Sequence, residues 1–144
     1  MSNDSVFSAA RASLDAYNSK NWDAVRVSVT DDCVYDETAT HRKVEGIVAI
    51  LEVWQGWAAA MPDSRATYEA TYAIEGGTVF ELTWRGTHTG PMQGPDGEIP
   101  ATGKSFEMRG CQVIEMDGDR AKVIRHYFDI CTMVSQLGLA QTLS

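Results

Sequence analysis

The sequence predicts an α+β fold in which three N-terminal helices pack on one side of an antiparallel sheet. Apolar residues in the N-terminal part recur at intervals of three and four, which is typical of helices with one buried face. From Arg65 onward the pattern changes to alternation, and the turns Gly76-Gly77 and Asp117-Gly118-Asp119 separate long alternating runs. The 144 residues, 44% of them hydrophobic, suit a single domain spanning 1–144 with a core of ordinary size.

Three helices are expected before the alternating runs. Asp4 or Ser5 caps the first, whose apolar stripe consists of Phe7, Ala10, Leu14 and Tyr17. Polar residues at 18–21 end this helix, and a short second helix follows, carrying Trp22, Val25 and Val29. Gly46 opens the third helix, and Pro62 closes it because proline disfavours a helical conformation at the preceding residue. The third helix has a broad apolar face made of Ile47, Ile50, Leu51, Trp54, Trp57, Ala58 and Met61.

Strands are expected on both sides of the third helix. A short strand at 33–36 turns at 38–41 and returns at 42–44. After the third helix come the four long strands of a meander, at 65–74, 79–88, 104–116 and 121–129. Residues 89–103 are so rich in glycine and proline that we expect a rim loop or flap without regular structure.

The last strand and the short amphipathic tail after it are the focus of the functional prediction. Strand alternation places two sets of residues on opposite faces: Arg125, Tyr127 and Asp129 on one, and Ile124, His126 and Phe128 on the other. An acid and a phenol therefore share one face at the end of an otherwise apolar strand.

Charge and composition exclude several classes of function. The chain has 12 basic and 20 acidic residues, and its formal charge of −8 repels phosphate backbones and anionic membranes. We therefore expect neither a nucleic-acid nor a membrane partner. The polar start of the chain, and the lack of an apolar run of about 20 residues, predict a soluble, cytoplasmic protein. Three widely spaced cysteines, Cys33, Cys111 and Cys131, are interpreted as small buried hydrophobic residues in a reducing compartment.

Several motifs resemble one protein family. They are Gly86-Thr87-His88-Thr89-Gly90-Pro91, Gly94-Pro95-Asp96-Gly97-Glu98-Ile99-Pro100, Thr102-Gly103-Lys104, Tyr127-Phe128-Asp129 and Gln136-Leu137-Gly138. With Trp22-Asp23, Trp54 and Met61-Pro62-Asp63, they resemble the SnoaL-like polyketide cyclases, also called ester cyclase-like, of the NTF2-like superfamily. The resemblance covers nearly the whole chain. It implies a cystatin-like cone with a strongly curved sheet, and a homodimer formed through the outer face of that sheet.

The resemblance also implies a catalytic role for Asp129, which lies seven residues before Gln136. This acid would remove a proton from a carbon between carbonyl groups and later protonate the new alkoxide of an aldol closure. A carboxylate in an apolar pocket has a raised pKa, which suits a base. In the alternative, Asp129 caps the C-terminal helix by accepting from amides near Thr132 or Met133. Arg125, on the same face, could lower the pKa of the acid by charge pairing.

Other polar residues are weaker candidates. Tyr127 and His88 would assist Asp129, the neutral imidazole by donating to a substrate carbonyl; the alternative is that His88 only holds the rim loop. The pair Asp36 and Glu37 could supply a second acid, although such a pair at a strand end is more often solvated. No metal or other cofactor is expected: the three histidines, His41, His88 and His126, lie in separate elements without a nearby second ligand.

The aromatic residues are either plain core or the walls of a substrate cavity. As cavity walls they would bind a small, flat, apolar molecule that contains a carbonyl group. The residues expected in these walls are Tyr17, Tyr35, Trp54, Trp57, Phe80 and Trp84. The sequence thus predicts a cofactor-free acid/base enzyme, a lyase or isomerase that abstracts a proton next to a carbonyl in an aldol-type cyclisation or an isomerisation. The alternative is a non-catalytic module of the same fold that binds a small molecule or a protein.

Overall fold

The computed structural model describes residues 3–94 and 96–139, and its N-terminal part contains the three expected helices. These are α1 (Asn3–Asn18), α2 (Trp22–Ser28) and α3 (Ile47–Ala60). Asn21 caps α2, since its side-chain oxygen accepts from the Ala24 amide over 3.1 Å. The helix α1 begins at Asn3, so Asp4 and Ser5 both lie inside it and neither precedes it as a cap. Val29, predicted in the second helix, is instead the first residue of the strand that follows.

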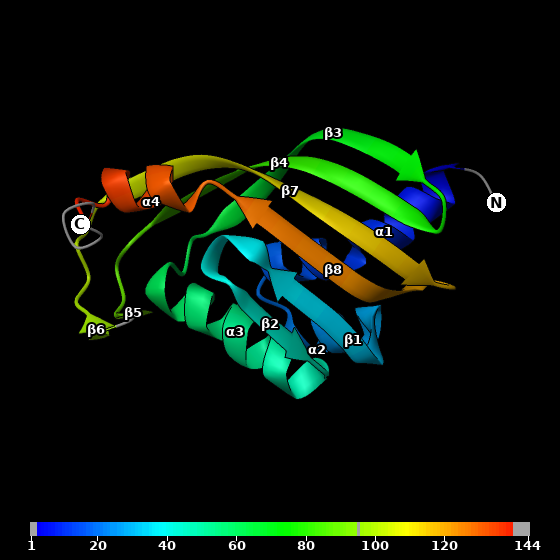
Figure 1. Cartoon of the computed structure of the whole chain (residues 1–144), viewed down its shortest axis with the longest axis horizontal. Coiled ribbons are helices and arrows are strands. Elements are labelled where there is room, and N and C mark those ends of the chain that lie inside the picture. Colours follow the sequence, from blue (N-terminus) through cyan, green and yellow to red (C-terminus); the bar gives the residue numbers. More distant parts are fainter. Residues whose placement is uncertain (1–2, 95, 140–144) are drawn as a thin grey trace.

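A six-stranded sheet forms the larger part of the molecule, in the order β2-β1-β8-β7-β4-β3 (Figure 1). Its strands are β1 (Val29–Glu37), β2 (Arg42–Glu45), β3 (Arg65–Ile74), β4 (Gly77–Thr87), β7 (Ser105–Asp117) and β8 (Arg120–Phe128). The four long strands form the expected antiparallel meander. The sheet is mixed, however, because β1 lies parallel to β8. This parallel pairing places Glu37 directly opposite His126.

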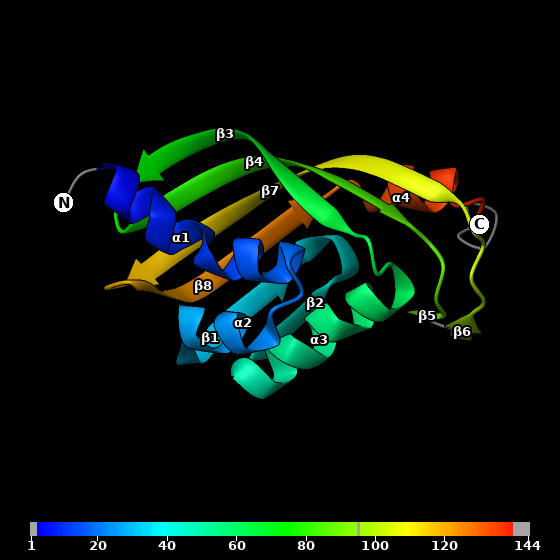
Figure 2. The ribbon, with the colours of Figure 1, turned by 180° about the vertical axis from the view of Figure 1, so that it is seen from behind.

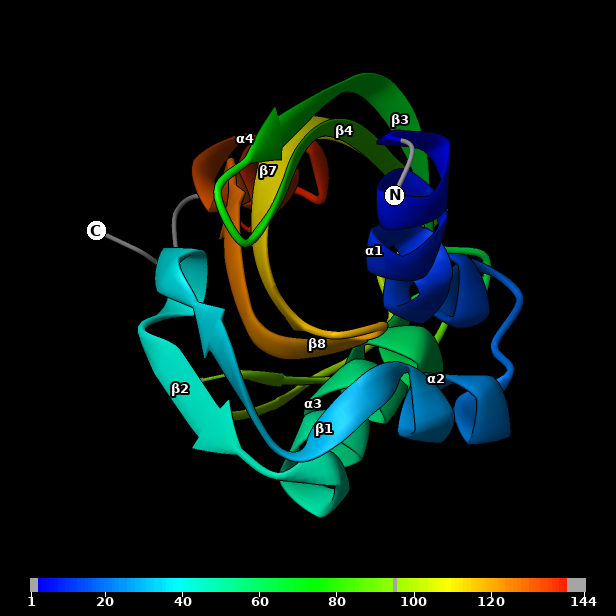
Figure 3. The same ribbon diagram turned by 90° about the vertical axis from the view of Figure 1, so that its right-hand side faces the viewer.

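The long strands curve around one side of the molecule, and α1 lies along their concave side (Figures 2 and 3). The helices α2 and α3 pack beside β1. Between the helices and the concave face lies the core, where Leu14, Ile50, Phe80, Leu82, Ile114 and Ile124 are almost fully buried. The α+β fold with a strongly curved sheet is therefore confirmed.

The segment between β4 and β7 differs from the expectation. It contains a small hairpin made of β5 (Met92–Gly94) and β6 (Gly97–Ile99), so the prediction of a wholly irregular rim loop is wrong. Gly97 has a φ of +117°, a conformation that other residues rarely adopt, and this permits the tight turn. The amides of Thr89 and Gly90 both donate to the Ala60 carbonyl, which ties the start of the segment to the end of α3.

The chain ends, within the described residues, with the short helix α4 (Ile130–Gln136), in agreement with the predicted tail. Among the described helices, none is long and apolar enough to cross a membrane. The homodimer stays a prediction. Of the cysteines, Cys33 is buried as expected, but Cys131 is exposed. Burial raises the pKa of Cys33 to about 12, so this thiol stays protonated at neutral pH.

Candidate active site

An apolar cavity lies between the concave face of the sheet and the helices. About 50 Å³ of it is open to water-sized molecules, enough for a few waters. The apolar part of its lining comes from α1, α3, β4, β7, β8 and α4, namely Leu14, Trp54, Met61, Trp84, Phe106, Met108, Phe128 and Met133. Polar atoms reach the same space from Tyr17, Tyr35, Glu37, Trp57, Ser64, Gln112 and His126. The cavity is thus mostly apolar with a small group of polar atoms at its centre, which is the usual character of a small-molecule site.

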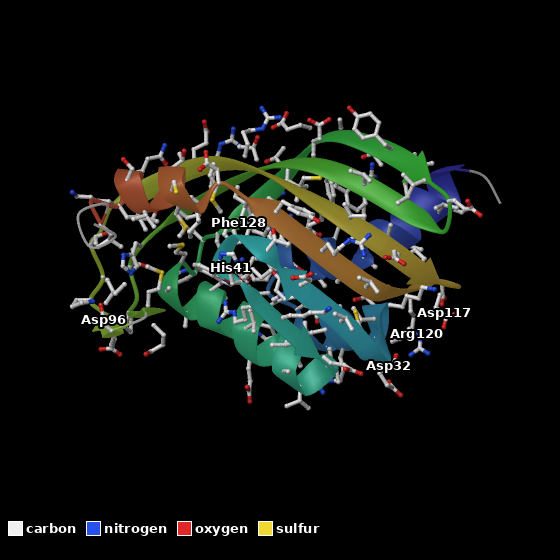
Figure 4. All side chains as sticks on the ribbon, viewed as in Figure 1. Asp32, His41, Asp96, Asp117, Arg120 and Phe128 are labelled. Atoms are coloured by element: carbon white, nitrogen blue, oxygen red, sulfur yellow. The ribbon has the colours of Figure 1, made fainter. Side chains whose placement is uncertain are left out.

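Two aromatic rings mark the mouth of this cavity. Trp57 and Phe128 are half-buried, whereas the other lining residues are buried. Their rings contact edge to face, with centroids 6.1 Å apart. Phe128 lies at the end of β8, close to the turn that carries His41 (Figure 4). These two rings are therefore the part of the cavity lining that lies nearest to solvent.

His126 is the central polar residue of the cavity. It points inward from β8 and is 6% exposed. The indole Nε1 of Trp84 donates to its Nε2 over 3.1 Å, and its Nδ1 lies 2.9 Å from the Tyr35 hydroxyl. Burial lowers the pKa of His126 to about 4, an effect that the charge of Glu37 partly opposes. The imidazole is therefore neutral at physiological pH.

The direction of these hydrogen bonds follows from the chemistry of the donors. An indole can only donate, so Nε2 of His126 must accept and the ring proton must be on Nδ1. Nδ1–H then donates to the oxygen of Tyr35, and the Tyr35 hydroxyl donates to Oε2 of Glu37 over 2.7 Å. The result is a directed chain from Trp84 through His126 and Tyr35 to Glu37.

Glu37 ends this chain as a buried carboxylate with 0% exposure. Oε1 accepts from the Thr40 hydroxyl over 2.6 Å and from the Arg42 guanidinium over 2.9 Å, and Oε2 accepts from the Trp57 indole over 3.0 Å. Burial raises the pKa of Glu37, but these donors and the Tyr35 hydroxyl outweigh it and bring the pKa below its usual value. Glu37 is therefore a fixed negative charge that faces His126 across Tyr35.

A second polar pair lies elsewhere on the cavity wall. The hydroxyls of Tyr17 and Ser64 are 2.6 Å apart, and both residues are buried. Burial raises the pKa of Tyr17 to about 12, and the Ser64 hydrogen bond opposes this only in part. The ammonium group of Lys20 lies over the Tyr17 ring, 4.3 Å from its centroid, and donates to the Ser64 carbonyl. At neutral pH the pair offers hydroxyl groups and no charge.

The family model of the SnoaL-like polyketide cyclases matches residues 7–137. The chain belongs to the SnoaL-like polyketide cyclase family. No curated protein matches it at a significant level.

Solved structures show the same fold at low sequence identity. The proposed polyketide cyclase IdmH of Streptomyces antibioticus is 24% identical, with a TM-score of 0.77 over 92% of this chain and 97% of that one. TsrD of Streptomyces laurentii is 20% identical, with a TM-score of 0.80 over 96% and 98% of the two chains. An LEH-like epoxide hydrolase of M. tuberculosis is 19% identical, with a TM-score of 0.72 over 96% and 93%. The fold is therefore shared with a proposed polyketide cyclase and with an epoxide hydrolase.

The cavity of this SnoaL-like chain contains most of the predicted aromatic residues. Tyr17, Tyr35, Trp54, Trp57 and Trp84 line it. Phe80 does not line it: this ring is fully buried in the core and packs on Tyr68, with centroids 5.0 Å apart. Phe80 therefore belongs to the core, on the same face of the sheet as Gln112, and not to the cavity wall.

Asp129 lies outside the cavity. It caps α4: its carboxylate accepts from the Thr132 amide over 3.0 Å and from the Thr132 hydroxyl over 2.6 Å, at an exposed position. These hydrogen bonds lower its pKa, the opposite of the raised pKa expected for a base in an apolar pocket. The geometry is that of the capping alternative. Arg125 pairs with Glu115 over 2.5 Å, so its charge is directed away from Asp129.

The two predicted helpers of Asp129 also lie outside the cavity. Tyr127 is 45% exposed on the outer face of β8. His88 is fully buried, where its Nδ1 accepts from the Thr102 amide over 3.3 Å and lies 3.1 Å from the Thr102 hydroxyl. Its backbone bonds Gly103 and Lys104, so His88 holds together the two ends of the loop between β4 and β7. Burial lowers the pKa of His88, and the Gly90 backbone opposes this shift.

Sequence reasoning did not select Ser64, Gln112 or His126 as residues of the cavity, although it named Glu37 as a possible second acid. Alternation along β8 is correct, but the cavity faces the side of His126 and not the side of Asp129. The expectation that the carboxylates of Asp36 and Glu37 are solvated at the strand end is wrong for Glu37, which is fully buried. One available signal was the pair of apolar residues that flank His126 on its face of the strand, Ile124 and Phe128, which marks that face as the inward one.

Proposed function

We propose that this protein is a cofactor-free enzyme that removes a proton from a carbon next to a carbonyl group, in a small, flat, apolar molecule bound in the cavity. The observation that carries the proposal is the directed chain from His126 through Tyr35 to Glu37 at the centre of the apolar cavity. Membership of the SnoaL-like polyketide cyclase family supports chemistry on a small molecule of this kind.

In this proposal His126 is the base. Its Nε2 carries the lone pair of the neutral ring, and among the described residues the indole N–H of Trp84 is the donor to that lone pair. When Nε2 accepts a proton, the ring becomes a cation held by Tyr35 and facing the negative charge of Glu37. Such a buried charge pair stabilises the protonated ring because the local dielectric is low. The released indole N–H of Trp84 can then donate to the oxygen of the enolate.

The basicity of His126 limits the substrate. A group with a pKa of about 4 is a weak base, so it suits only acidic carbons. These are carbons between two carbonyl groups, or between a carbonyl group and an aromatic ring. The aromatic walls of the cavity, such as Trp54, favour flat ring compounds of this type. Cyclisation and isomerisation both begin with this step.

The experiment uses 2-tetralone, a flat ketone with one carbon between a carbonyl and an aromatic ring. Deuterium uptake at that carbon is followed by proton NMR in D₂O with wild-type protein, His126→Gln and the control His41→Asn, whose exposed histidine lies outside the cavity. We expect the wild type and the control to accelerate exchange, and His126→Gln to fall to the rate in buffer while circular dichroism shows an intact fold.

The alternative is the non-catalytic binding module. It predicts that 2-tetralone shifts the indole NMR signals of Trp57 and Trp84 without any acceleration of exchange. Equal acceleration by wild type and His126→Gln would contradict the assignment of the base. Acceleration lost in Asp129→Asn but kept in His126→Gln would restore the role that the family resemblance implies for Asp129.

A further inference from the structure

Gln112 is the one polar side chain of the described cavity lining that makes no hydrogen bond to any described residue. The residue is 3% exposed, and its side chain faces the cavity. By contrast, the other polar groups there are all paired: Tyr35 with Glu37, for example, and Trp84 with His126. A buried amide with free donors and a free acceptor is thus aimed at the space where a ligand binds.

The sheet register places this amide beside the proposed base. Gln112 lies on β7 directly opposite His126 on β8, and opposite Phe80 on β4. Side chains of directly opposite residues in an antiparallel pair lie on the same face, about 5 Å apart at their Cβ atoms. A ligand atom within reach of His126 is therefore also close to the amide of Gln112.

The amide of Gln112 keeps only a small accessible surface, so on folding it loses most of its hydration without gaining a hydrogen bond to a described residue. Buried polar groups in native proteins are nearly always hydrogen-bonded, and an unpaired one retains its desolvation penalty. At this position of β7 the nearby residues on the same face, Met108, Gly110 and Ile114, have no polar side chain. An apolar residue would suit the wall of the empty cavity better than glutamine does. A hydrogen bond from the amide of Gln112 to a bound ligand would account for the glutamine at this position.

We propose that Gln112 determines specificity by selecting flat ring compounds in which a carbonyl oxygen stands beside a hydroxyl or N–H donor. The amide NH₂ donates to the carbonyl oxygen of the ligand, and the amide oxygen accepts from the neighbouring donor. This inference rests on the proposed function only in that both place the ligand in the same cavity. A ligand held in this way presents its carbonyl group to His126, so Gln112 also positions the substrate.

The experiment compares two matched probes, 2-quinolone and N-methyl-2-quinolone. Both are flat and carry a carbonyl group, but the methyl compound lacks the adjacent N–H. Dissociation constants are measured by NMR titration for the wild type, for Gln112→Leu and for the control Gln55→Leu, whose exposed amide on α3 lies outside the cavity. We expect the wild type and the control to bind 2-quinolone about tenfold more tightly than the methyl compound, as one added hydrogen bond implies.

In Gln112→Leu the preference should fall to less than about twofold, with unchanged or stronger binding of N-methyl-2-quinolone. The side-chain amide signal of Gln112 should shift in wild-type protein saturated with 2-quinolone. A preference that persists in Gln112→Leu would overturn the proposal, because the methyl group would then be rejected for its bulk. No preference in the wild type, or no binding of either probe at its solubility limit, would overturn it as well.

The readout separates this inference from the proposed function, because it measures binding and not turnover. A Gln112-dependent preference together with no proton exchange on 2-tetralone would reject the catalytic proposal and keep the specificity role. Proton exchange that depends on His126, without a binding preference that depends on Gln112, would keep the catalytic proposal and reject the specificity role.

Discussion

Trp84 donates its indole N–H to Nε2 of His126 over 3.1 Å, although the two residues lie on strands separated by β7. The residue of β7 between them is Gly110. A Cβ atom at Gly110 would lie 3.4 Å from the Trp84 ring and 3.2 Å from Cβ of Phe128. Glycine in the middle of a strand often marks such a close approach. The bare backbone of Gly110 leaves space for the indole to reach across β7.

Replacing Trp84 with Phe should raise the pKa of His126. The indole N–H stabilises the neutral ring by donating to its lone pair, and phenylalanine has no such donor. One net hydrogen bond of about 1 kcal/mol corresponds to a rise of roughly 0.7 pH units above the wild-type pKa of about 4. NMR titration of the ring measures it. Trp22→Phe is the control, because it makes the same substitution in a ring that packs on Tyr17 and does not donate to His126. An unchanged or lower pKa in Trp84→Phe would contradict the assigned tautomer.

Acid should destabilise the protein through His126. The folded-state pKa of about 4 lies below the model value of 6.5, so the unfolded chain binds the proton first as the pH falls. The stability due to neutral burial is therefore complete above pH 6.5 and is lost as the pH falls toward 4. Between pH 7 and 4.5 this amounts to about 2 kcal/mol of unfolding free energy. Glu37, whose pKa is lowered, adds to the loss only below its model value of 4.5.

Urea unfolding at pH 7 and pH 4.5 measures this effect. The loss of unfolding free energy should be about 2 kcal/mol smaller in His126→Gln than in the wild type. His41→Asn, which removes an exposed histidine with a φ of +57°, should keep the wild-type loss. Equal losses in wild type and His126→Gln would show that His126 is not buried in its neutral form.

Local sequence patterns were enough to predict the helices and the long strands. Helical spacing, the Pro62 break and the glycine turns all depend on neighbours in sequence, and these elements lie where they were expected. The parallel pairing of β1 with β8 depends instead on contacts between residues about 90 positions apart, such as Glu37 and His126. Nothing in the local pattern specifies that pairing.

The centre of the candidate site was missed for this same reason. Glu37 is buried only because its partners converge on it from three elements: the short turn after β1, β2 and α3. Alternation along β8 separated His126 from Asp129 correctly, but it could not say which face looks into the cavity. The family resemblance favoured Asp129, whereas the structure places His126 inside.

Asp129 should matter for stability and not for proton exchange. Its carboxylate accepts from the amide and the hydroxyl of Thr132 at the start of α4. Asp129→Ala removes both hydrogen bonds and should lower the melting temperature, whereas Asp129→Asn, which keeps a good capping side chain, should lower it less. Exchange of 2-tetralone should match the wild type in both variants. Loss of exchange in Asp129→Asn, with the melting temperature kept, would mean that Asp129 contributes to the chemistry.

Gln112→Leu should stabilise the ligand-free protein. The substitution replaces an unpaired, buried amide by an apolar side chain of similar size, in a wall that already contains Met108 and Phe106. Removing the desolvation penalty is worth about 1–2 kcal/mol, or roughly 3–6 °C in melting temperature for a domain of this size. Differential scanning calorimetry of wild type, Gln112→Leu and the exposed control Gln55→Leu measures the shift. A lower melting temperature in Gln112→Leu would mean that the amide is paired in the folded protein, and the role of Gln112 in ligand selection would lose its physical basis.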